Sequence, residues 1–238
     1  MDGVRRSLGL IRAFRVEQSD PASCYRTLSA DAVVQLSRHT MIEDALILDV
    51  GGGPGYFAEA VRAAGGRCIT VDPSARELSL HDRQPGVAAV ATGTALPMSD
   101  GAVDVCCSFN TLEHVPEPRT LLDELFRVTR PGGIIDLSVT NWLSPWGGHE
   151  TSPWHYFGGH RAARRYHKRH RRPPKNRFGE SLFVVSVAEV VRWVRVDSRV
   201  DVLDVRPRYY PSWCRSLARV PWAREVATWN LSLVLRRK

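Results

Sequence analysis

Residues 46–56, Leu-Ile-Leu-Asp-Val-Gly-Gly-Gly-Pro-Gly-Tyr, join an apolar run of strand length to a glycine-rich turn. An amphipathic stretch follows, and a second apolar run, residues 69–72, ends on Asp72, 17 residues after the last glycine. A strand, a glycine-rich turn, a helix and a second strand that ends on an acid are typical of nucleotide-cofactor sites. The stretch therefore predicts an α/β fold with such a site at the carboxyl edge of its sheet.

The spacing of the glycines distinguishes between cofactors. Dinucleotide dehydrogenases carry a glycine at the third position of G-x-G-x-x-G, where Tyr56 stands in this chain. The pattern is instead G-x-G-x-G, at Gly51, Gly53 and Gly55. Glycine at these positions lets the backbone approach a ligand closely and adopt positive φ angles. An oxidoreductase is therefore disfavoured.

With this motif and the segments that follow it, the chain resembles the class I S-adenosylmethionine-dependent methyltransferases, in particular small-molecule, methyltransferase 11-like members from actinobacteria. The further segments are residues 91–98, the Glu113-His114-Val115 run and the apolar residues 134–140. The resemblance implies a Rossmann-like, doubly wound, seven-stranded sheet with an antiparallel last strand. Residues 200–206 and 229–235 are expected to be its antiparallel sixth and seventh strands. The implied cofactor is S-adenosylmethionine.

The resemblance also implies which residues bind this cofactor. Backbone N–H groups of the glycine-rich turn would meet its carboxylate end, and Asp72 would accept hydrogen bonds from its ribose hydroxyls. Asp49 would face its amino group or order the turn. Relatives commonly carry an acid for the adenine where Thr92 stands, which leaves a backbone N–H near Gly93 for that contact. The predicted cofactor-binding set is Asp49, Gly51, Gly53, Gly55, Asp72, Thr92, Gly93 and Asn110.

Glu113 and His114, at the end of the predicted fourth strand, have the chemistry of an acid/base pair. In the resembled family this pair belongs to the architecture under the cofactor, and we favour that role over catalysis. Enzymes that methylate exocyclic base nitrogens typically carry an Asn/Asp-Pro-Pro-aromatic signature at this place. This chain does not, which argues against that activity.

The five cysteines, Cys24, Cys68, Cys106, Cys107 and Cys214, include no C-x-x-C pair. We expect reduced thiols, no disulfide framework and no metal site, as in a cytoplasmic enzyme. No apolar run approaches the ~20 residues needed to cross a bilayer. The first residues lack the long apolar core and cleavage site of a signal peptide, and we interpret them as a covering helix.

The net charge of +8 comes from one segment of the chain. Nine of the 33 basic residues and no acidic residue fall within residues 161–177, and the remaining 24 nearly balance the 25 acidic residues. If residues 159–172 are helical, six of these cations share one face, and their repulsion favours a negative partner. The six are Arg161, Arg164, Arg165, Lys168, Arg169 and Arg172. A solvated face and an anionic substrate or membrane surface stay open, whereas nucleic acid is disfavoured because only Tyr166 offers stacking.

Residues 141–160 hold three tryptophans, a tyrosine, a phenylalanine, three histidines and four glycines. Because elements after the fifth strand supply substrate specificity in the resembled family, we interpret residues 141–180 as a substrate lid. If the acceptor is a hydroxyl, a general base helps the transfer, and His149, Glu150 and His155 are the candidate catalytic residues for that role. A structural or surface role is the alternative for each. We favour His149, because it follows a Gly-Gly hinge near the fifth strand.

We expect one domain with an N-terminal helical cap (1–40), a cofactor-binding core (41–140), the lid (141–180) and a C-terminal helix with two strands (181–238). The predicted function is methyl transfer to a small-molecule or lipid-linked acceptor, with an anionic acceptor or a peripheral membrane site as readings of the basic helix. The alternative is a catalytically silent, cofactor-binding scaffold that holds an anionic partner.

Overall fold

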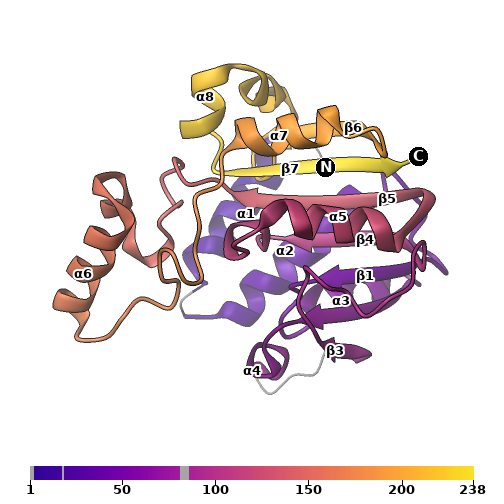
Figure 1. Ribbon diagram of the computed structural model, residues 1–238, viewed down its shortest axis with the longest axis horizontal. Coiled ribbons are helices and arrows are strands. Elements are labelled where there is room, and N and C mark those ends of the chain that lie inside the picture. Colours follow the sequence, from indigo (N-terminus) through magenta and orange to yellow (C-terminus); the bar gives the residue numbers. More distant parts are fainter. Residues whose placement is uncertain (1–2, 18, 81–85) are drawn as a thin grey trace.

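A seven-stranded sheet with the strand order β3-β2-β1-β4-β5-β7-β6 runs through the molecule (Figure 1). The strands are β1 (Leu46–Val50), β2 (Arg67–Asp72), β3 (Ala88–Val90), β4 (Val103–Phe109), β5 (Thr129–Thr140), β6 (Val200–Pro207) and β7 (Asn230–Arg237). The computed structural model describes residues 3–17, 19–80 and 86–238.

The strand directions confirm the predicted Rossmann-like α/β sheet with an antiparallel last strand. Strands β1 to β5 are parallel to one another, and β7 is antiparallel to both β5 and β6. Since β6 pairs antiparallel with β7, it points the same way as the first five strands. The predicted sixth and seventh strands are therefore confirmed as an antiparallel pair, in which β7 is the reversed strand.

Helices lie on both faces of the sheet (Figure 1). The helices are α1 (Val4–Arg15), α2 (Pro21–Leu36), α3 (Tyr56–Ala63), α4 (Ala75–Leu78), α5 (Pro118–Val128), α6 (Gly159–His170), α7 (Val187–Val196) and α8 (Pro221–Val226). Helices α2 and α3 share one core with Ile47, and α5 and α7 share the other with Leu48. These neighbours in β1 are both fully buried because strand side chains alternate between the two faces of a sheet.

In the described part of the chain, short 3-10 helices lie in the connections: η2 (Leu112–His114), η3 (His149–Thr151), η4 (Trp154–Phe157) and η5 (Ser212–Arg219). Helix α5 ends at Val128, just before the Arg-Pro-Gly-Gly stretch at 130–133. The stretch itself belongs to β5, at an irregularity in the pairing with β4. Gly132 has φ of 76° there, a conformation that favours glycine.

The segment between β5 and α7 leaves the carboxyl edge of the sheet, and α6 protrudes from that edge (Figure 1). Its two ends are held together, because Trp142 N donates to Val185 O at 2.9 Å. Helix α6 ends at His170, since Arg171 takes a left-handed backbone conformation with φ of 57°. The predicted helix over 159–172 was therefore two residues too long, and Arg172 lies outside the shared face.

Aromatic side chains from the N-terminal helix and from the C-terminal part of the chain pack together at the same edge of the sheet. Phe14 of α1 packs against Tyr209 and Trp229, with ring centroids 4.8 and 4.6 Å apart, and Trp146 stacks on Trp229 at 4.1 Å. These rings join the N-terminal cap, the β6–β7 connection and the lid. All five cysteines are free and buried. Among the described residues, no helix combines the length and apolar character needed to span a membrane.

Candidate functional site

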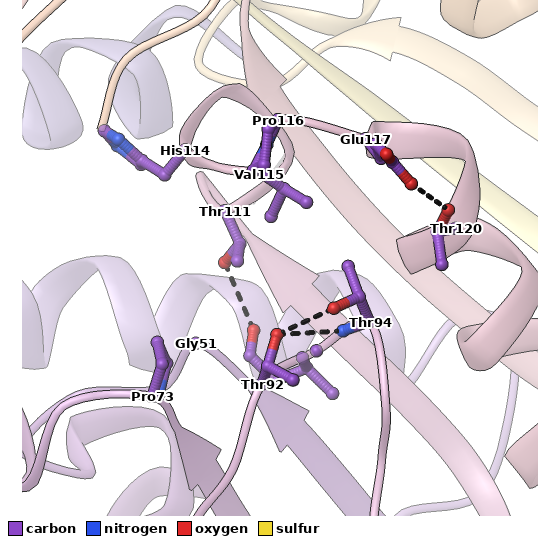
Figure 2. A pocket seen from close by; sticks show the side chains of 12 residues that line it. Gly51, Pro73, Thr92, Thr94, Thr111, His114, Val115, Pro116, Glu117 and Thr120 are labelled. Carbon is purple, nitrogen blue, oxygen red and sulfur yellow. Dashed lines mark hydrogen bonds between the residues drawn. The ribbon is translucent and has the colours of Figure 1, made fainter. Parts of the chain in front are cut away.

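A cavity of about 340 Å³ opens at the carboxyl edge of the sheet, above β1 and β4 (Figure 2). The strand order reverses between these two strands, which is where open α/β sheets bind ligands. The cavity is lined by Val50, Gly51, Pro73, Thr92, Gly93, Thr94, Thr111, His114, Val115, Pro116, Glu117 and Thr120. Three of the predicted cofactor-binding residues, Gly51, Thr92 and Gly93, are therefore in its wall.

The glycine-rich turn requires glycine for two physical reasons. Gly51, Gly53 and Gly55 have φ angles of 79°, 50° and 79°, which L side chains rarely adopt. A Cβ on Gly51 would collide with the Thr111 side chain. A Cβ on Gly53 would instead meet no heavy atom within 4 Å. The turn therefore leaves open space beside Gly53, as a ligand-binding turn must.

Both acids of the motif, Asp49 and Asp72, lie against the glycine-rich turn. Asp72 Oδ2 accepts from Gly53 N at 3.2 Å, and its Oδ1 accepts from Ser74 N at 2.8 Å. A carboxylate has further lone pairs, so Asp72 can still accept hydrogen bonds from a ligand. Asp49 lies under Gly52, where a Cβ would collide with its carboxylate. This position favours ordering of the turn over contact with the cofactor's amino group.

Burial shifts the pKa of both acids upward. It raises the pKa of Asp49 to about 7, and the nearby charge of Asp72 adds to that effect. Burial also raises the pKa of Asp72, while the hydrogen bonds from Ser74 and Gly53 oppose the shift. Asp49 Oδ2 is buried without a hydrogen-bond partner among the described residues. Asp72 is thus the better placed of the two to meet a ligand as an anion.

The remaining predicted cofactor residues differ in what they contact. Thr92 Oγ1 lies 2.8 Å from Thr94 Oγ1, so two hydroxyls stand where relatives commonly carry an acid. A Cβ on Gly93 would lie 2.7 Å from the Leu121 side chain, so packing of α5 requires this glycine. Asn110 Oδ1 accepts from Asn230 Nδ2 at 2.7 Å, outside the cavity wall. Ligand contacts of these residues stay predictions.

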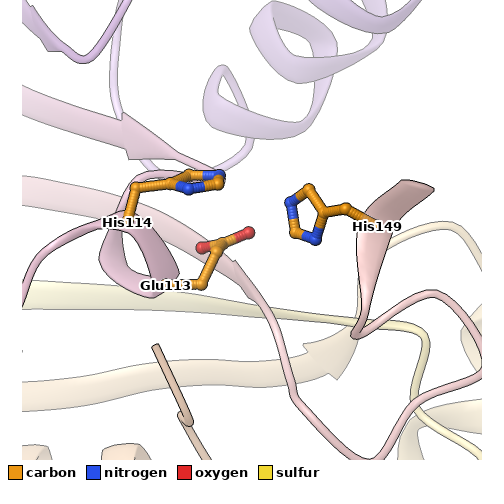
Figure 3. Close-up of side chains that lie close together, drawn as sticks. All are labelled: Glu113, His114 and His149. Atoms are coloured by element: carbon orange, nitrogen blue, oxygen red, sulfur yellow. The ribbon is translucent and has the colours of Figure 1, made fainter. Parts of the chain in front are cut away.

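Three side chains from two distant segments come together beside the cavity: Glu113, His114 and His149 (Figure 3). One ligand-type atom from each lies within 4.8 Å of those of the others. The rings of His114 and His149 are edge to face, with centroids 5.0 Å apart. Burial lowers the pKa of His149, although the charge of Glu113 acts in the opposite direction. The structure thus brings the favoured catalytic candidate to the edge of the cofactor cavity.

The other two candidate catalytic residues lie elsewhere. Glu150 is exposed and accepts a hydrogen bond from Asn176 Nδ2 at 3.0 Å. His155 is 1% exposed, packs against Trp142 and has Nε2 3.2 Å from the carbonyl oxygen of Ser144. These contacts fit the surface and structural roles that were the alternatives for the two residues. Neither belongs to the cavity wall.

The Gly-Gly pair before His149 has a packing role. A Cβ on Gly147 would collide with the backbone of Trp142, and one on Gly148 would lie 2.5 Å from His155 Cβ. Neither glycine has a positive φ angle. The pair therefore lets three parts of the lid approach closely, whereas the sequence suggested a hinge. His149 itself has φ of 49°, which is uncommon for a residue with a side chain.

Sequence reasoning missed part of the cavity wall. Thr111, Val115, Pro116, Glu117 and Thr120 line it, and none was a predicted site residue. Their position after β4, the strand next to the glycine-rich strand, is the signal that could have found them. Figure 2 shows His114 on one side of the cavity and Glu117 and Thr120 on the other side.

The fold and its glycine-rich turn define a class I methyltransferase, and comparisons with known proteins agree. A model of the methyltransferase domain family matches residues 48–136. A protein of Mycobacteroides abscessus named an uncharacterized methyltransferase is 46% identical, over 98% of this chain and 94% of its own. The chain belongs to this methyltransferase family.

Solved structures share the fold. An S-adenosylmethionine-dependent methyltransferase from Mesorhizobium loti matches with a TM-score of 0.59 and 16% identity, over 87% of this chain and 98% of its own. Geranyl diphosphate C-methyltransferase from Streptomyces coelicolor, solved with Mg²⁺, geranyl diphosphate and S-adenosylhomocysteine, matches with a TM-score of 0.56 and 18% identity. That match covers 93% of this chain and 83% of the other.

The protein is therefore an S-adenosylmethionine-dependent methyltransferase. This function replaces the two alternatives, a catalytically silent scaffold and an oxidoreductase. The open space beside Gly53 and the acid at the end of β2 fit the cofactor. Gly51, Gly53, Asp72 and Thr92 would hold it. When bound, the cofactor supplies a methyl group activated by a positively charged sulfur.

Proposed function

We propose that this methyltransferase modifies a small-molecule or lipid-linked acceptor that carries both an anionic group and an apolar portion. The observation that carries the proposal is a row of unpaired cations on α6. Arg161, Arg164, Lys168 and Arg169 are exposed, and none has a carboxylate partner among the described residues. Like charges at this spacing repel each other, so an anion bound along the helix would stabilise it.

Basic residues elsewhere in the chain contrast with this row. Arg127 pairs with Glu124 at 2.6 Å, and Arg130 pairs with Asp104 at 2.6 Å. In the lid itself, Lys175 and Arg177 also have carboxylate partners. Those cations are each neutralised by a carboxylate, whereas four cations on one helix, α6, are not. A bound phosphate or carboxylate is the natural complement of several neighbouring guanidinium groups.

Aromatic side chains at the same edge of the sheet support the apolar portion. In the lid, Trp146, Trp154 and Phe157 are 48%, 42% and 69% exposed. Trp213 and Trp222, in the connection from β6 to β7, are 74% and 76% exposed. Because β6 ends at the carboxyl edge and β7 begins there, this connection lies on the same side as the lid. Exposed apolar surface of this kind marks binding sites.

The enzyme's own contribution is to hold the acceptor against the methyl group and to exclude water. Methyl transfer is an in-line displacement, so orientation and desolvation supply much of the rate. Arg165 lies over the Trp154 ring, with its guanidinium carbon 3.8 Å from the ring centroid. This contact ties the cationic helix to the aromatic part of the lid, so that one acceptor can meet both.

The test measures methyl transfer from radiolabelled S-adenosylmethionine to matched acceptors: a fatty acid, a lipid phosphate, a soluble sugar phosphate and the neutral alcohol of each. We expect transfer only to anionic acceptors with an acyl or isoprenoid chain. The double variant Arg164→Glu/Lys168→Glu should raise the acceptor KM roughly tenfold, the effect of about 1.4 kcal/mol. Its affinity for S-adenosylmethionine should stay unchanged.

Arg192→Glu/Arg195→Glu is the matched control, because it makes the same charge change on exposed positions of α7. This control should leave the acceptor KM unchanged at equal ionic strength. Equal transfer to neutral and anionic acceptors would overturn the anionic part of the proposal. Transfer to sugar phosphates alone would overturn the apolar part.

A further inference from the structure

We infer that Glu113, His114 and His149 form a binding site for one divalent transition-metal ion of the zinc type at the acceptor side of the cavity. Two imidazoles and one carboxylate are a ligand set that holds zinc or iron while leaving positions free for other ligands. One ligand-type atom from each residue lies within 4.8 Å of the others. The inference concerns the protein alone and does not depend on the nature of the acceptor.

The distances are compatible with a small contraction on binding. A zinc ion keeps nitrogen and oxygen ligands about 2.0–2.2 Å away, so two of its ligand atoms lie about 3–3.5 Å apart. Figure 3 shows the Glu113 carboxylate directed into the space between the two imidazole rings. No hydrogen bond joins any two of the three side chains in the described part of the chain. An ordinary hydrogen-bonded network does not account for their meeting.

Only one of the two oxygens of the Glu113 carboxylate has a hydrogen-bond partner among the described residues. Its Oε1 accepts from Thr140 N at 3.0 Å, whereas its Oε2 is buried without a partner among the described residues. The side chain is only 1% exposed. A buried carboxylate oxygen is costly to leave unsatisfied, and a cation is its strongest partner. The orphaned Oε2 is the second observation that points to an ion.

Each histidine is oriented by a backbone carbonyl. His114 Nδ1 lies 2.6 Å from Ser181 O, and His149 Nδ1 lies 3.4 Å from Gly147 O. A carbonyl oxygen only accepts, so Nδ1 must donate, and the neutral ring then carries its lone pair on Nε2. Metal-binding histidines typically donate their other N–H in this way. These contacts favour, in both rings, the tautomer whose free Nε2 can bind a metal.

The site also explains why His149 adopts an uncommon backbone conformation. Its φ of 49° places the side chain beside Glu113, and the close packing of Gly147 and Gly148 holds it there. Sparsely populated backbone conformations tend to persist where function requires them. Since His114 also lines the cavity, free positions on the ion would face an oxygen ligand, either water or a hydroxyl, carboxylate or phosphate oxygen of the acceptor.

Zinc binding to the full chain tests the inference. The purified protein is stripped with a chelator, dialysed and titrated calorimetrically with Zn²⁺ under reducing conditions, and Co²⁺ is then added to record its visible spectrum. We expect one equivalent of Zn²⁺ per chain and a Co²⁺ spectrum of nitrogen and oxygen ligation. Glu113→Gln keeps an acceptor for Thr140 N, and His149→Asn tolerates the positive φ angle. Each should weaken binding at least tenfold.

The matched control is His167→Gln/His170→Gln, which removes two exposed histidines from α6. It should bind Zn²⁺ like the wild type, and all variants should keep the wild-type circular dichroism spectrum and a cooperative thermal unfolding transition as evidence of folding. No binding to the wild type, equal binding in Glu113→Gln and His149→Asn, or loss in the α6 control would overturn the inference. A sulfur-to-cobalt charge-transfer band would also overturn it. None of these results bears on the anionic acceptor.

Discussion

The cofactor-binding core (residues 41–140) and the lid (residues 141–180) are stabilised by different means. In the core, backbone pairing joins β1 to β2 and β4, and apolar side chains fill both faces of the sheet. In the lid, three short helices are held by ring contacts and by glycines that permit close approach. We therefore propose that cofactor binding and acceptor recognition reside in separable parts of one chain.

Gly53→Val gives the largest effect expected in the core. Valine at φ of 50° is strained, and its side chain would occupy the open space beside the turn. We expect the affinity for S-adenosylmethionine to fall more than about 100-fold, since a filled site leaves no room for the ligand. Isothermal titration calorimetry measures this change.

Gly101→Val is the control for strain, because Gly101 has φ of 64° and lies before β4, at the opposite edge of the sheet. It should lower stability without abolishing cofactor binding. Normal affinity in Gly53→Val would refute the assignment of the turn as the cofactor site.

Gly148→Ala tests whether the lid is separable from the core. The new Cβ would lie 2.5 Å from His155 Cβ, so the packing inside the lid must shift. We expect local opening of the lid, seen as roughly tenfold faster trypsin cleavage within residues 161–177, because proteolysis follows the population of locally open states. Affinity for S-adenosylmethionine should change less than about twofold.

Gly9→Ala makes the same chemical change in α1, where a Cβ meets no atom within 4 Å, and it should leave cleavage of the lid unaltered. A parallel loss of cofactor affinity in Gly148→Ala would mean that lid and core form one cooperative unit.

The same contrast explains what the sequence could predict. The order and type of the core elements follow from local patterns: apolar runs, helical spacing of Leu121, Leu122 and Leu125, and glycines at a turn. The cluster of Glu113, His114 and His149 has no such pattern, because it forms only when the lid folds back over the end of β4. Spacing in the chain carries no information on that contact.

Local competition between interactions explains the smaller errors. The end of α6 moved from 172 to 170 because Arg171 adopts a left-handed conformation before Pro173 and Pro174 are reached. The residues around Gly132 joined β5 because an irregular pairing with β4 accommodates them. The side chain of Asn110, whose contact with the cofactor stays a prediction, accepts hydrogen bonds from Asn230 and Ser138. Partners remote in sequence decided the pairing of β5 and of Asn110, whereas a local backbone conformation ended α6.

Glu124→Gln gives the smallest effect expected and tests how α5 holds the loop beside the cavity. Glu124 accepts from Leu96 N at 2.6 Å and from Arg127 Nε at 2.6 Å. The hydrogen bond from Arg127 is the main reason that the pKa of Glu124 lies below its ordinary value of 4.5. A depressed pKa means that the ionised carboxylate stabilises the folded state above pH 4.5, and that this contribution is lost as the pH falls through the folded-state pKa.

We therefore expect Glu124→Gln to lower the free energy of unfolding by about 1 kcal/mol at pH 7, given its partly exposed partner. Urea unfolding at several pH values should show the difference from the wild type shrinking below pH 4.5. Asp123→Asn changes the neighbouring, more exposed carboxylate of α5, and it should lower the free energy of unfolding by a smaller amount. Since the loop carries Thr92 and Thr94 into the cavity wall, cofactor affinity should also fall slightly, while trypsin cleavage of the lid stays unchanged. A pH-independent difference would show that lost packing, and not the ionised pair, anchors this loop.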